Sequence, residues 1–264
     1  MLRDKISSRT LTLGSWITLG HPAIAEIKAK AGFDWLVVDL EHSVISIDVA
    51  GELIRTIDLC GAAPLVRLTS NDPDQIKRVM DAGAHGIVVP MVNTPAEAAR
   101  AVAATRYAPA GSRGVGLARA QGYGAAFPEY LKWQSHGPVV IVQIEHKDAI
   151  DQLEKILAVP GVDGFIIGPY DLSCSMGIPG QFEQPDFINA MKRIRETGQR
   201  LGCLAGLHIV EPDPERLAQA VREGYNFIAY SVDIRMLDVS ARRGIAKWKE
   251  IPIARRPMNG DSPL

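Results

Sequence analysis

The stretch AGFDWLVVD, residues 31–39, is a short run of large apolar and β-branched residues that follows a glycine and ends in a carboxylate. A glycine also stands just before an apolar run in AGAHGIVVP (82–90), PGVDGFIIG (160–168) and EGYNFIAYS (223–231). Each of these glycines is expected to end a helix in the left-handed conformation and to lead into the next strand. The repeat therefore predicts that helices and parallel strands alternate along the chain.

Eight apolar runs can be interpreted as strands, and they are continuous rather than alternating, as is typical of parallel strands covered by helices. They lie at residues 13–19, 35–39, 64–68, 86–92, 139–145, 164–168, 203–208 and 227–232. Helix-like segments such as NDPDQIKRVMDAG (71–83) separate most of them. We expect an α/β fold, a single (β/α)8 (TIM) barrel domain over residues 1–250. A doubly wound open sheet is the alternative, but no Gly-rich dinucleotide loop follows the first strand.

The composition argues against nucleic acid as the main partner. The chain has 264 residues and a formal charge of -1, whereas duplex binding needs a clustered basic face. Three cysteines, no signal-peptide core and no apolar run of membrane-spanning length lead us to expect a cytoplasmic protein with neither a nucleic-acid nor a membrane partner. The segment 251–264, IPIARRPMNGDSPL, is expected to be a flexible tail. The Gly- and Arg-rich segment 106–124 is predicted to form a functional loop over the barrel mouth.

Polar residues gather where the predicted strands end. Active sites of such barrels form at the carboxyl ends of the strands. The residues found there are Asp39 with His42, Arg67, Gln143 with Glu145, and Asp171. We therefore predict that these side chains share one site.

Glu145 and Asp171 follow consecutive strands, so their carboxylates could converge. Two carboxylates without a thiolate favour a hard divalent cation such as Mg²⁺ or Mn²⁺, with positions left for water and substrate. In the alternative interpretation each carboxylate only caps the helix that follows it. Spacing leaves both interpretations open.

Arg67 and His42 also have two interpretations each. An arginine inside an apolar strand needs an anionic partner, which is either a site carboxylate or an anionic substrate whose oxyanion it stabilises. His42 follows Asp39 by three residues. A carboxylate that orients an imidazole makes a general base near neutral pH. The alternative is an ordinary loop histidine.

Five stretches together resemble the HpcH/HpaI aldolase family, the metal-dependent class II pyruvate aldolases of the phosphoenolpyruvate/pyruvate superfamily. They are FDWLVVDLEH (33–42), PLVRLTSNDPDQIKRVMDAGAHGIVVPMV (64–92), TRYAPAGSRGVG (105–116), VQIEHKDAI (142–150) and GVDGFIIGPYDLSCSMG (161–177). The resemblance, which runs from about residue 13 to 240, implies a TIM barrel that assembles as a homohexamer, a trimer of dimers with the C-terminal helix exchanged between subunits. It implies a carbon–carbon lyase that reversibly cleaves a 4-hydroxy-2-oxo acid (2-keto-3-deoxy acid type) to pyruvate and an aldehyde. The implied cofactor is Mg²⁺ or Mn²⁺, with Co²⁺ or Zn²⁺ also compatible.

The resemblance assigns roles to the predicted site residues. Glu145 and Asp171 are similar to the metal ligands, and Arg67 to the residue that contacts the ketone oxygen and steadies the enolate. His42, oriented by Asp39, is similar to the acid–base dyad.

The remaining assignments concern substrate contacts and the subunit boundary. Gln143, Gly168, Pro169 and Tyr170 match positions that contact the substrate, and Asp81 matches a residue near the subunit boundary that reaches an adjacent site. Tyr170 departs from the small residue often found there, which predicts a reshaped aldehyde pocket. The stretch AGLHIVEPD (205–213) also differs from the usual exit of the seventh strand.

Two other functions fit the same fold. A C–C lyase like citrate lyase β or malyl-CoA lyase would need a basic pocket for the CoA phosphate, and none is evident in the sequence. A non-catalytic oligomer that binds a 2-oxo acid is the other alternative. The presence of every expected site residue argues against it, because binding alone would not require all of them. Both are kept as alternatives.

Overall fold

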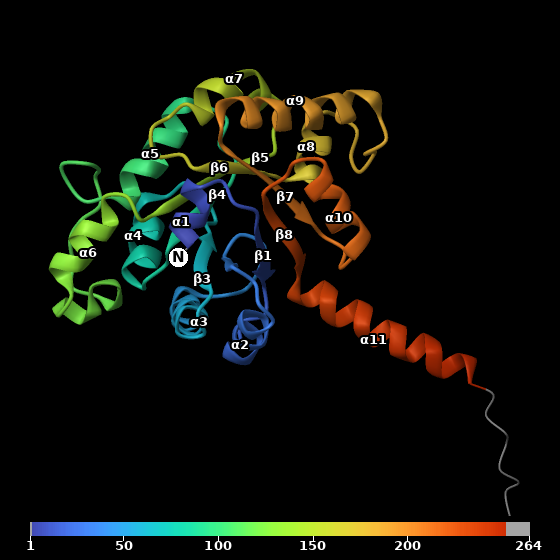
Figure 1. Cartoon of the computed structure of the whole chain (residues 1–264), viewed down its shortest axis with the longest axis horizontal. Helices are drawn as coiled ribbons and strands as arrows, with labels where there is room; N and C mark the ends of the chain where they lie inside the picture. Colours follow the sequence, from blue (N-terminus) through green and yellow to red (C-terminus); the bar gives the residue numbers. More distant parts are fainter. Residues whose placement is uncertain (1, 252–264) are drawn as a thin grey trace, which may run out of the picture.

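A computed structural model describes residues 2–251, and its eight strands form one closed parallel barrel. Each strand pairs with the next along the chain, and β8 returns to pair with β1 (Figure 1). The predicted (β/α)8 fold is confirmed. The strands are β1 (Thr12–Ile17), β2 (Trp35–Asp39), β3 (Ala63–Arg67), β4 (Gly86–Val89), β5 (Val139–Ile144), β6 (Gly164–Ile167), β7 (Leu204–Ile209) and β8 (Phe227–Val232).

Helices surround the barrel, and half of those described begin at a proline, as expected where the first N–H needs no partner. They are α1 (Leu2–Ser7), α2 (Pro22–Lys30), α3 (Ile47–Leu59), α4 (Pro73–Asp81), α5 (Pro95–Thr105), the 3-10 helix η1 (Arg119–Gly124), α6 (Phe127–Gln134), α7 (Lys147–Leu157), α8 (Pro169–Ser175), α9 (Pro185–Leu201), α10 (Pro214–Arg222) and α11 (Asp233–Glu250). The four glycines before the apolar runs have positive φ angles, which confirms the predicted left-handed ends: Gly32, Gly83, Gly161 and Gly224.

The observed strands are close to the predicted ones, but several end earlier. The run 86–92 pairs only as far as Val89, because Pro90 has no N–H to donate to a ladder and Met91 turns away with φ of 52°. The run 139–145 ends at Ile144, because His146 already caps the next helix. The residues that were expected to end these strands therefore lie in the loops at the barrel mouth.

The barrel interior is filled by alternate residues of the strands. Trp35 and Val37 point inward and are fully buried, whereas Leu36 and Val38 pack against the helices outside. The Trp35 ring stacks on Phe227 with centroids 4.1 Å apart and planes 5° from parallel. This alternation leaves the inward positions at the carboxyl ends of the strands to form the next layer above the core.

The amino-terminal end of the barrel is closed by α1. Leu2 and Ile6 are buried in the same cluster as the interior side chains. Arg3 forms an ion pair of 2.5 Å with Asp163, which precedes β6. Any cavity that binds substrate inside the barrel must therefore open at the carboxyl-terminal end.

The Gly- and Arg-rich segment between β4 and β5 does not follow the prediction. Arg119 donates to Asp58 at 2.5 Å and to the carbonyl oxygen of Ala82 at 3.4 Å. These partners stand near the C-terminal ends of α3 and α4, and the helices run antiparallel to the strands. Arg119 therefore lies at the amino-terminal end of the barrel, and the expected loop over the mouth was wrong for this residue.

The C-terminal helix α11 extends away from the barrel (Figure 1). No helix within residues 2–251 is long and apolar enough to cross a membrane. Of the segment predicted to be a flexible tail, only Ile251 belongs to the described residues, and 252–264 lie outside them.

Candidate functional site

Four strands supply the layer of side chains above the barrel core. Trp16 (β1), Arg67 (β3), Gln143 (β5) and His208 (β7) occupy inward positions at the carboxyl ends of alternate strands. This is the layered packing of a TIM barrel, in which one layer comes from the odd-numbered strands. All four line a cavity of about 220 Å³.

Arg67 is held by two carboxylates. It is the register partner of Asp39 on β2, and its Nε and Nη2 donate to the Asp39 carboxylate at 2.8 and 2.6 Å. Its Nη1 lies 3.3 Å from Glu41 Oε2, and its guanidinium stacks 4.4 Å above the Trp16 ring. Burial raises the pKa of Asp39, but the hydrogen bonds and charge of Arg67 outweigh burial and lower it. The interpretation that Arg67 pairs with a site carboxylate is confirmed, and Arg67 also faces the cavity.

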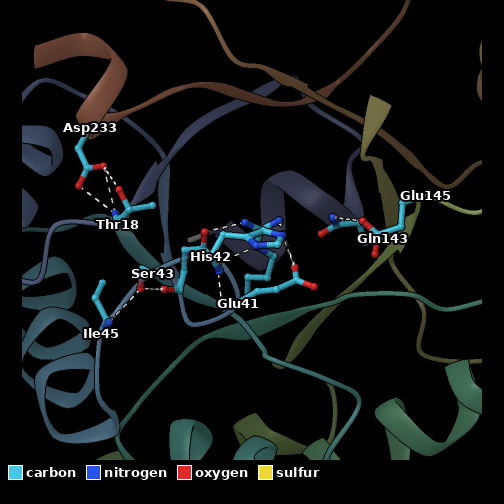
Figure 2. Close-up of polar contacts among 10 residues, drawn as sticks. Thr18, Glu41, His42, Ser43, Ile45, Gln143, Glu145 and Asp233 are labelled. Atoms are coloured by element: carbon cyan, nitrogen blue, oxygen red, sulfur yellow. Dashed lines mark hydrogen bonds and ion pairs between the residues drawn. The ribbon is translucent and has the colours of Figure 1, made fainter. Parts of the chain in front are cut away.

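His42 lies in the loop after β2 with its imidazole 65% exposed. Asp39 Oδ1 accepts hydrogen bonds from the backbone N–H groups of Glu41 (3.0 Å) and His42 (3.3 Å). The imidazole Nε2 instead lies 3.7 Å from Glu41 Oε2 (Figure 2). This corrects the expected contact between Asp39 and the His42 ring: Asp39 orients the backbone of the loop, and Glu41 is the carboxylate beside the imidazole.

Other polar contacts hold the loops that follow β1 and β2. Asp233 accepts from the N–H and the hydroxyl of Thr18 at 2.9 and 2.7 Å (Figure 2). Ser43 donates to the carbonyl oxygen of Asp39 and accepts from the N–H of Ile45 at 3.1 Å. These contacts fix the chain on both sides of the cavity.

Glu145 is only 3% exposed and follows β5 directly. One carboxylate oxygen accepts from the Met91 N–H at 2.6 Å, and the other accepts from the Gln143 side chain. Burial raises the pKa of Glu145 to about 7; the hydrogen bonds from Met91 and Gln143 lower it, and the charges of Glu41 and Asp171 raise it further. The helix that follows is capped by His146, so the alternative in which Glu145 is only a helix cap was wrong.

Asp171 stands in the first turn of α8, and its side chain is exposed toward the cavity that it lines. The residue at the N-cap of α8 is Gly168, not Asp171. The charge of Asp171 raises the pKa of both Glu41 and Glu145, although burial is the largest cause in each case. The two carboxylates therefore lie within electrostatic range of each other at the mouth of the barrel.

The donor set fits a hard divalent cation. In the described part of the chain no group of three or more His, Cys, Asp or Glu side chains converges as a ligand set. The candidate ligands are nevertheless all oxygen atoms. They belong to the carboxylates of Glu145 and Asp171 and to the nearby side-chain amide of Gln143. That Gln143 oxygen is buried and has no hydrogen-bond partner among residues 2–251. Oxygen donors with open positions suit Mg²⁺ or Mn²⁺ better than a thiolate-binding metal.

The junction of β6 and α8 brings backbone close to these ligands. A Cβ at Gly168 would lie 2.9 Å from the Glu145 carboxylate and 3.2 Å from the Gln143 amide. Pro169 and Tyr170 follow and line the same cavity. Tyr170 is 55% exposed and packs edge-on against Phe182, with ring centroids 5.0 Å apart. It also borders a neighbouring cavity of about 780 Å³.

Asp81 is the predicted residue that the structure does not bring to this site. It ends α4 at the amino-terminal end of the barrel, where it pairs with the buried Arg113 at 2.5 Å. A cavity of about 750 Å³ also lies at that end, where two of its charged residues, Asp58 and Arg119, are paired with each other. The reach of Asp81 into an adjacent subunit stays a prediction.

Sequence reasoning assigned no role to Trp16, Glu41 or His208, which all belong to the site. Trp16 and His208 occupy the inward positions that correspond to Arg67 and Gln143 on other strands. The alternation along β1 and β7 was therefore the signal that could have identified them.

Comparison with known proteins agrees with this geometry. The family model for HpcH/HpaI aldolase/citrate lyase matches residues 12–238. The hydroxypyruvate/pyruvate aldolase of Roseovarius nubinhibens is 38% identical over 253 residues, which cover 94% of this chain and 96% of that protein. The 4-hydroxy-2-oxo-heptane-1,7-dioate aldolase of Salmonella typhimurium is 39% identical over 257 residues, which cover 93% of this chain and 95% of that protein.

A solved structure supports the same relationship. The crystal structure of an HpcH/HpaI aldolase/citrate lyase family protein from Burkholderia cenocepacia is similar with a TM-score of 0.89 and 33% identity, over 94% of this chain and 98% of that one. Matches of this length and identity show to which family the chain belongs. This chain belongs to the HpcH/HpaI aldolase/citrate lyase family.

Proposed function

We propose that this protein is a metal-dependent class II aldolase that reversibly cleaves a 4-hydroxy-2-oxo acid to pyruvate and an aldehyde. The observation that carries the proposal is the placement of one guanidinium, Arg67, and two carboxylates, Glu145 and Asp171, around the mouth of one barrel. The aldolase names of relatives at 38–39% identity support it. Neither alternative, a CoA-thioester lyase or a non-catalytic binding oligomer, is favoured by an observation of its own.

Glu145 and Asp171 would hold the cation, Mg²⁺ or Mn²⁺ with Co²⁺ or Zn²⁺ also compatible. When bound, such an ion supplies Lewis-acid polarisation of the carboxylate and ketone oxygens of a 2-oxo acid. Gln143 and the backbone that follows Gly168 bind the oxo acid beside it. Glu145 and Gln143 are buried, so they act strongly on a substrate bound beside them.

The chain's own residues then carry the proton and the charge. In the cleavage direction His42 takes the proton from the C4 hydroxyl, and the negative Glu41 beside the ring stabilises the imidazolium. The C3–C4 bond breaks, the aldehyde leaves, and the electron pair of that bond forms the enolate of pyruvate. The His42 imidazolium then gives the proton to C3 of the enolate, which completes pyruvate. Arg67 faces the enolate oxygen and stabilises its negative charge. In synthesis the same steps run in reverse.

A coupled assay tests the function. Pyruvate released from a 4-hydroxy-2-oxo acid is followed by NADH oxidation with lactate dehydrogenase. We expect EDTA to abolish release and Mn²⁺ or Mg²⁺ to restore it. Full activity in EDTA, or covalent trapping of pyruvate by borohydride, would show a lysine mechanism instead.

Matched variants test the ligand assignment in the same assay. Glu145→Ala and Asp171→Ala are expected to lose metal-dependent turnover. Lys147→Ala serves as the control, because Lys147 is an exposed charged residue in the first turn of α7. Unchanged rates in both carboxylate variants would refute the assignment.

We also propose that the protein works as a homohexamer, a trimer of dimers that exchange α11, in the cytoplasm. The exposed apolar residues of α11 support an exchange, since they need a surface to cover them: Ile234, Leu237, Ile245 and Trp248. All three cysteines are free thiols, which is typical of a reducing compartment.

A further inference from the structure

A groove on the outside of the barrel adjoins the site cavity. The cavity of about 220 Å³ at the barrel mouth and the neighbouring cavity of about 780 Å³ share four lining residues: Pro169, Tyr170, His208 and Val210. The larger cavity is a groove between α9 and α10, and we call it the α9–α10 groove. Its floor is the outer face of β7, where Leu207 and Ile209 belong to the apolar cluster of the surrounding helices. A molecule bound at the mouth can therefore extend into this groove.

A row of aromatic rings leads from the site into the groove. Tyr170 packs edge-on against Phe182 with ring centroids 5.0 Å apart, and Phe182 lies 5.3 Å from Phe187. Phe187 is buried, whereas Tyr170 is 55% exposed and Ile188, also in the groove wall, is 48% exposed. Large apolar side chains that remain open to solvent in a concave surface are typical of a binding site for an apolar group.

The charges of the groove favour a neutral group over an acidic one. Arg195 and Arg216 share the carboxylate of Glu223, at 3.9 and 3.3 Å. Two further carboxylates, Glu183 and Asp213, line the end of the groove that is nearer the mouth, and neither forms an ion pair within residues 2–251. Like charges repel, so a ligand with a second carboxylate is disfavoured at this end.

We propose that the α9–α10 groove binds the substituent of the acceptor aldehyde, and that this acceptor is a neutral aldehyde with an aryl or alkyl group of several carbon atoms. This inference rests on the proposed function. Arg67 and Gln143, which contact the oxo acid in that function, line the site cavity from β3 and β5. Tyr170 and Val210 line its border with the groove. The oxo acid therefore occupies the inner part of the cavity and leaves the acceptor on the side of the groove.

The groove takes no part in the bond change. C3 of pyruvate loses one proton and bonds to the carbonyl carbon of the aldehyde, whose oxygen gains a proton. The substituent is the same in the product, and no oxidant or reductant is needed. Burial of an apolar substituent raises kcat/KM for the acceptors that carry it and leaves short acceptors unaffected. Phe182 and Ile188 thus determine specificity and are not catalytic residues.

The experiment measures kcat/KM for several aldehydes with pyruvate and saturating Mn²⁺. Wild type is expected to use 3-phenylpropanal about tenfold or more better than acetaldehyde. It should also use pentanal better than 5-oxopentanoate, which has the same chain length and a terminal carboxylate. Ile188→Glu places a carboxylate in the groove, and Phe182→Ala removes a ring from its wall. Each should lower kcat/KM for 3-phenylpropanal about tenfold or more and keep the value for acetaldehyde within about twofold of wild type.

Leu131→Glu is the matched control, because Leu131 is 44% exposed on α6, a helix that borders the cavity at the opposite end of the barrel. It should keep the wild-type ratio of the two kcat/KM values. Wild type without the preference for 3-phenylpropanal, or with a preference for 5-oxopentanoate, would overturn the inference. A ratio within about twofold of wild type in both groove variants would also overturn it, as would equal losses with both aldehydes, which a general structural role predicts. Turnover with none of the aldehydes would overturn the proposed function as well.

Discussion

At the scale of single residues, the carboxylates of the site outnumber its one guanidinium. Arg67 forms its ion pairs with Asp39 and Glu41, and these two acids share its charge. Glu145 and Asp171 have no such cation beside them among the described residues. A buried carboxylate without a counter-charge binds a proton more readily. The raised pKa of Glu145 reflects this excess of negative charge, and a bound divalent cation would balance the charge.

The pKa of Glu145 predicts how the metal-free protein responds to pH. Its folded value, about 7, lies above the ordinary value of 4.5, so the folded state holds the proton more tightly than the unfolded state. This contribution to stability is fully present below about pH 4.5 and is lost as the pH rises through about 7. In EDTA, the loss should be on the order of 3 kcal/mol, measured by urea unfolding between pH 4.5 and 8.5.

The control for this measurement is Glu145→Gln, which keeps the size of the side chain and cannot ionise. The difference in unfolding free energy between wild type and this variant should change with pH, because other titrating groups cancel. Saturating Mn²⁺ should remove the loss in wild type by binding the ionised carboxylate. A difference that stays constant across this range would show that Glu145 is not buried without a counter-charge.

At the scale of elements, the junction of β6 and α8 sets the spacing between backbone and ligands. Gly168 has φ of -94°, which any residue can adopt, so its importance does not lie in backbone strain. It lies in space, because a Cβ would approach the Glu145 carboxylate to 2.9 Å. The position of the Glu145 carboxylate therefore requires a residue without a Cβ at position 168.

Gly168→Ala is expected to push the Glu145 carboxylate away while leaving the barrel folded. We expect kcat/KM to fall about tenfold or more and the Mn²⁺ concentration for half activation to rise, since a small misplacement at a site is costly. The melting temperature should change by only a few degrees. Gly51→Ala, inside α3 with no atom within 4 Å of the added carbon and no left-handed backbone, is the control for an added methyl group away from the site. Wild-type Mn²⁺ activation in Gly168→Ala would contradict the spacing argument.

Elements were the part of the structure that the sequence predicted best. Continuous apolar runs identify all eight strands, because burial on both faces leaves a local signal, and a glycine at the end of the preceding helix marks four of them. The structure also places Arg67, Gln143 and Glu145 at or directly after the carboxyl ends of β3 and β5, where the strand ends predicted them. The contact between Glu41 and the His42 ring was not predictable, since both residues lie in a loop whose course depends on hydrogen bonds to Asp39. Local patterns do not encode such loop geometry.

The partners of Arg67 show the same limit. The sequence required an anionic partner for a strand arginine, but two interpretations remained open until the register of β2 and β3 placed Asp39 beside it. Segment 106–124 was misplaced for a similar reason. Its glycines and arginines indicate a long loop, whereas the end of the barrel to which it attaches depends on the distant Asp58 and Ala82.

At the scale of the whole molecule, the two ends of the barrel differ in structure: one is closed and the other carries the candidate site. The amino-terminal end is closed by α1 and by ion pairs such as Arg3 with Asp163. The carboxyl-terminal end carries the ligands, the guanidinium and the loops that hold them. The helix after β8 belongs to neither end, because it extends away instead of completing the ring of helices (Figure 1).

The exposed apolar side of α11 makes oligomerisation a testable property of this sequence. Leu237 is 62% exposed and Trp248 is 56% exposed, so a carboxylate at either position costs an isolated chain little. In an exchanged dimer the same carboxylate would be buried against an apolar surface at a cost of several kcal/mol. Leu237→Glu and Trp248→Glu should therefore shift the mass measured by light scattering from a hexamer toward smaller species.

Arg243→Glu also adds a negative charge to α11 but replaces an exposed polar residue, and it should remain a hexamer. Wild type that runs as a single chain at micromolar concentration, or glutamate variants that keep the full mass, would refute the exchange.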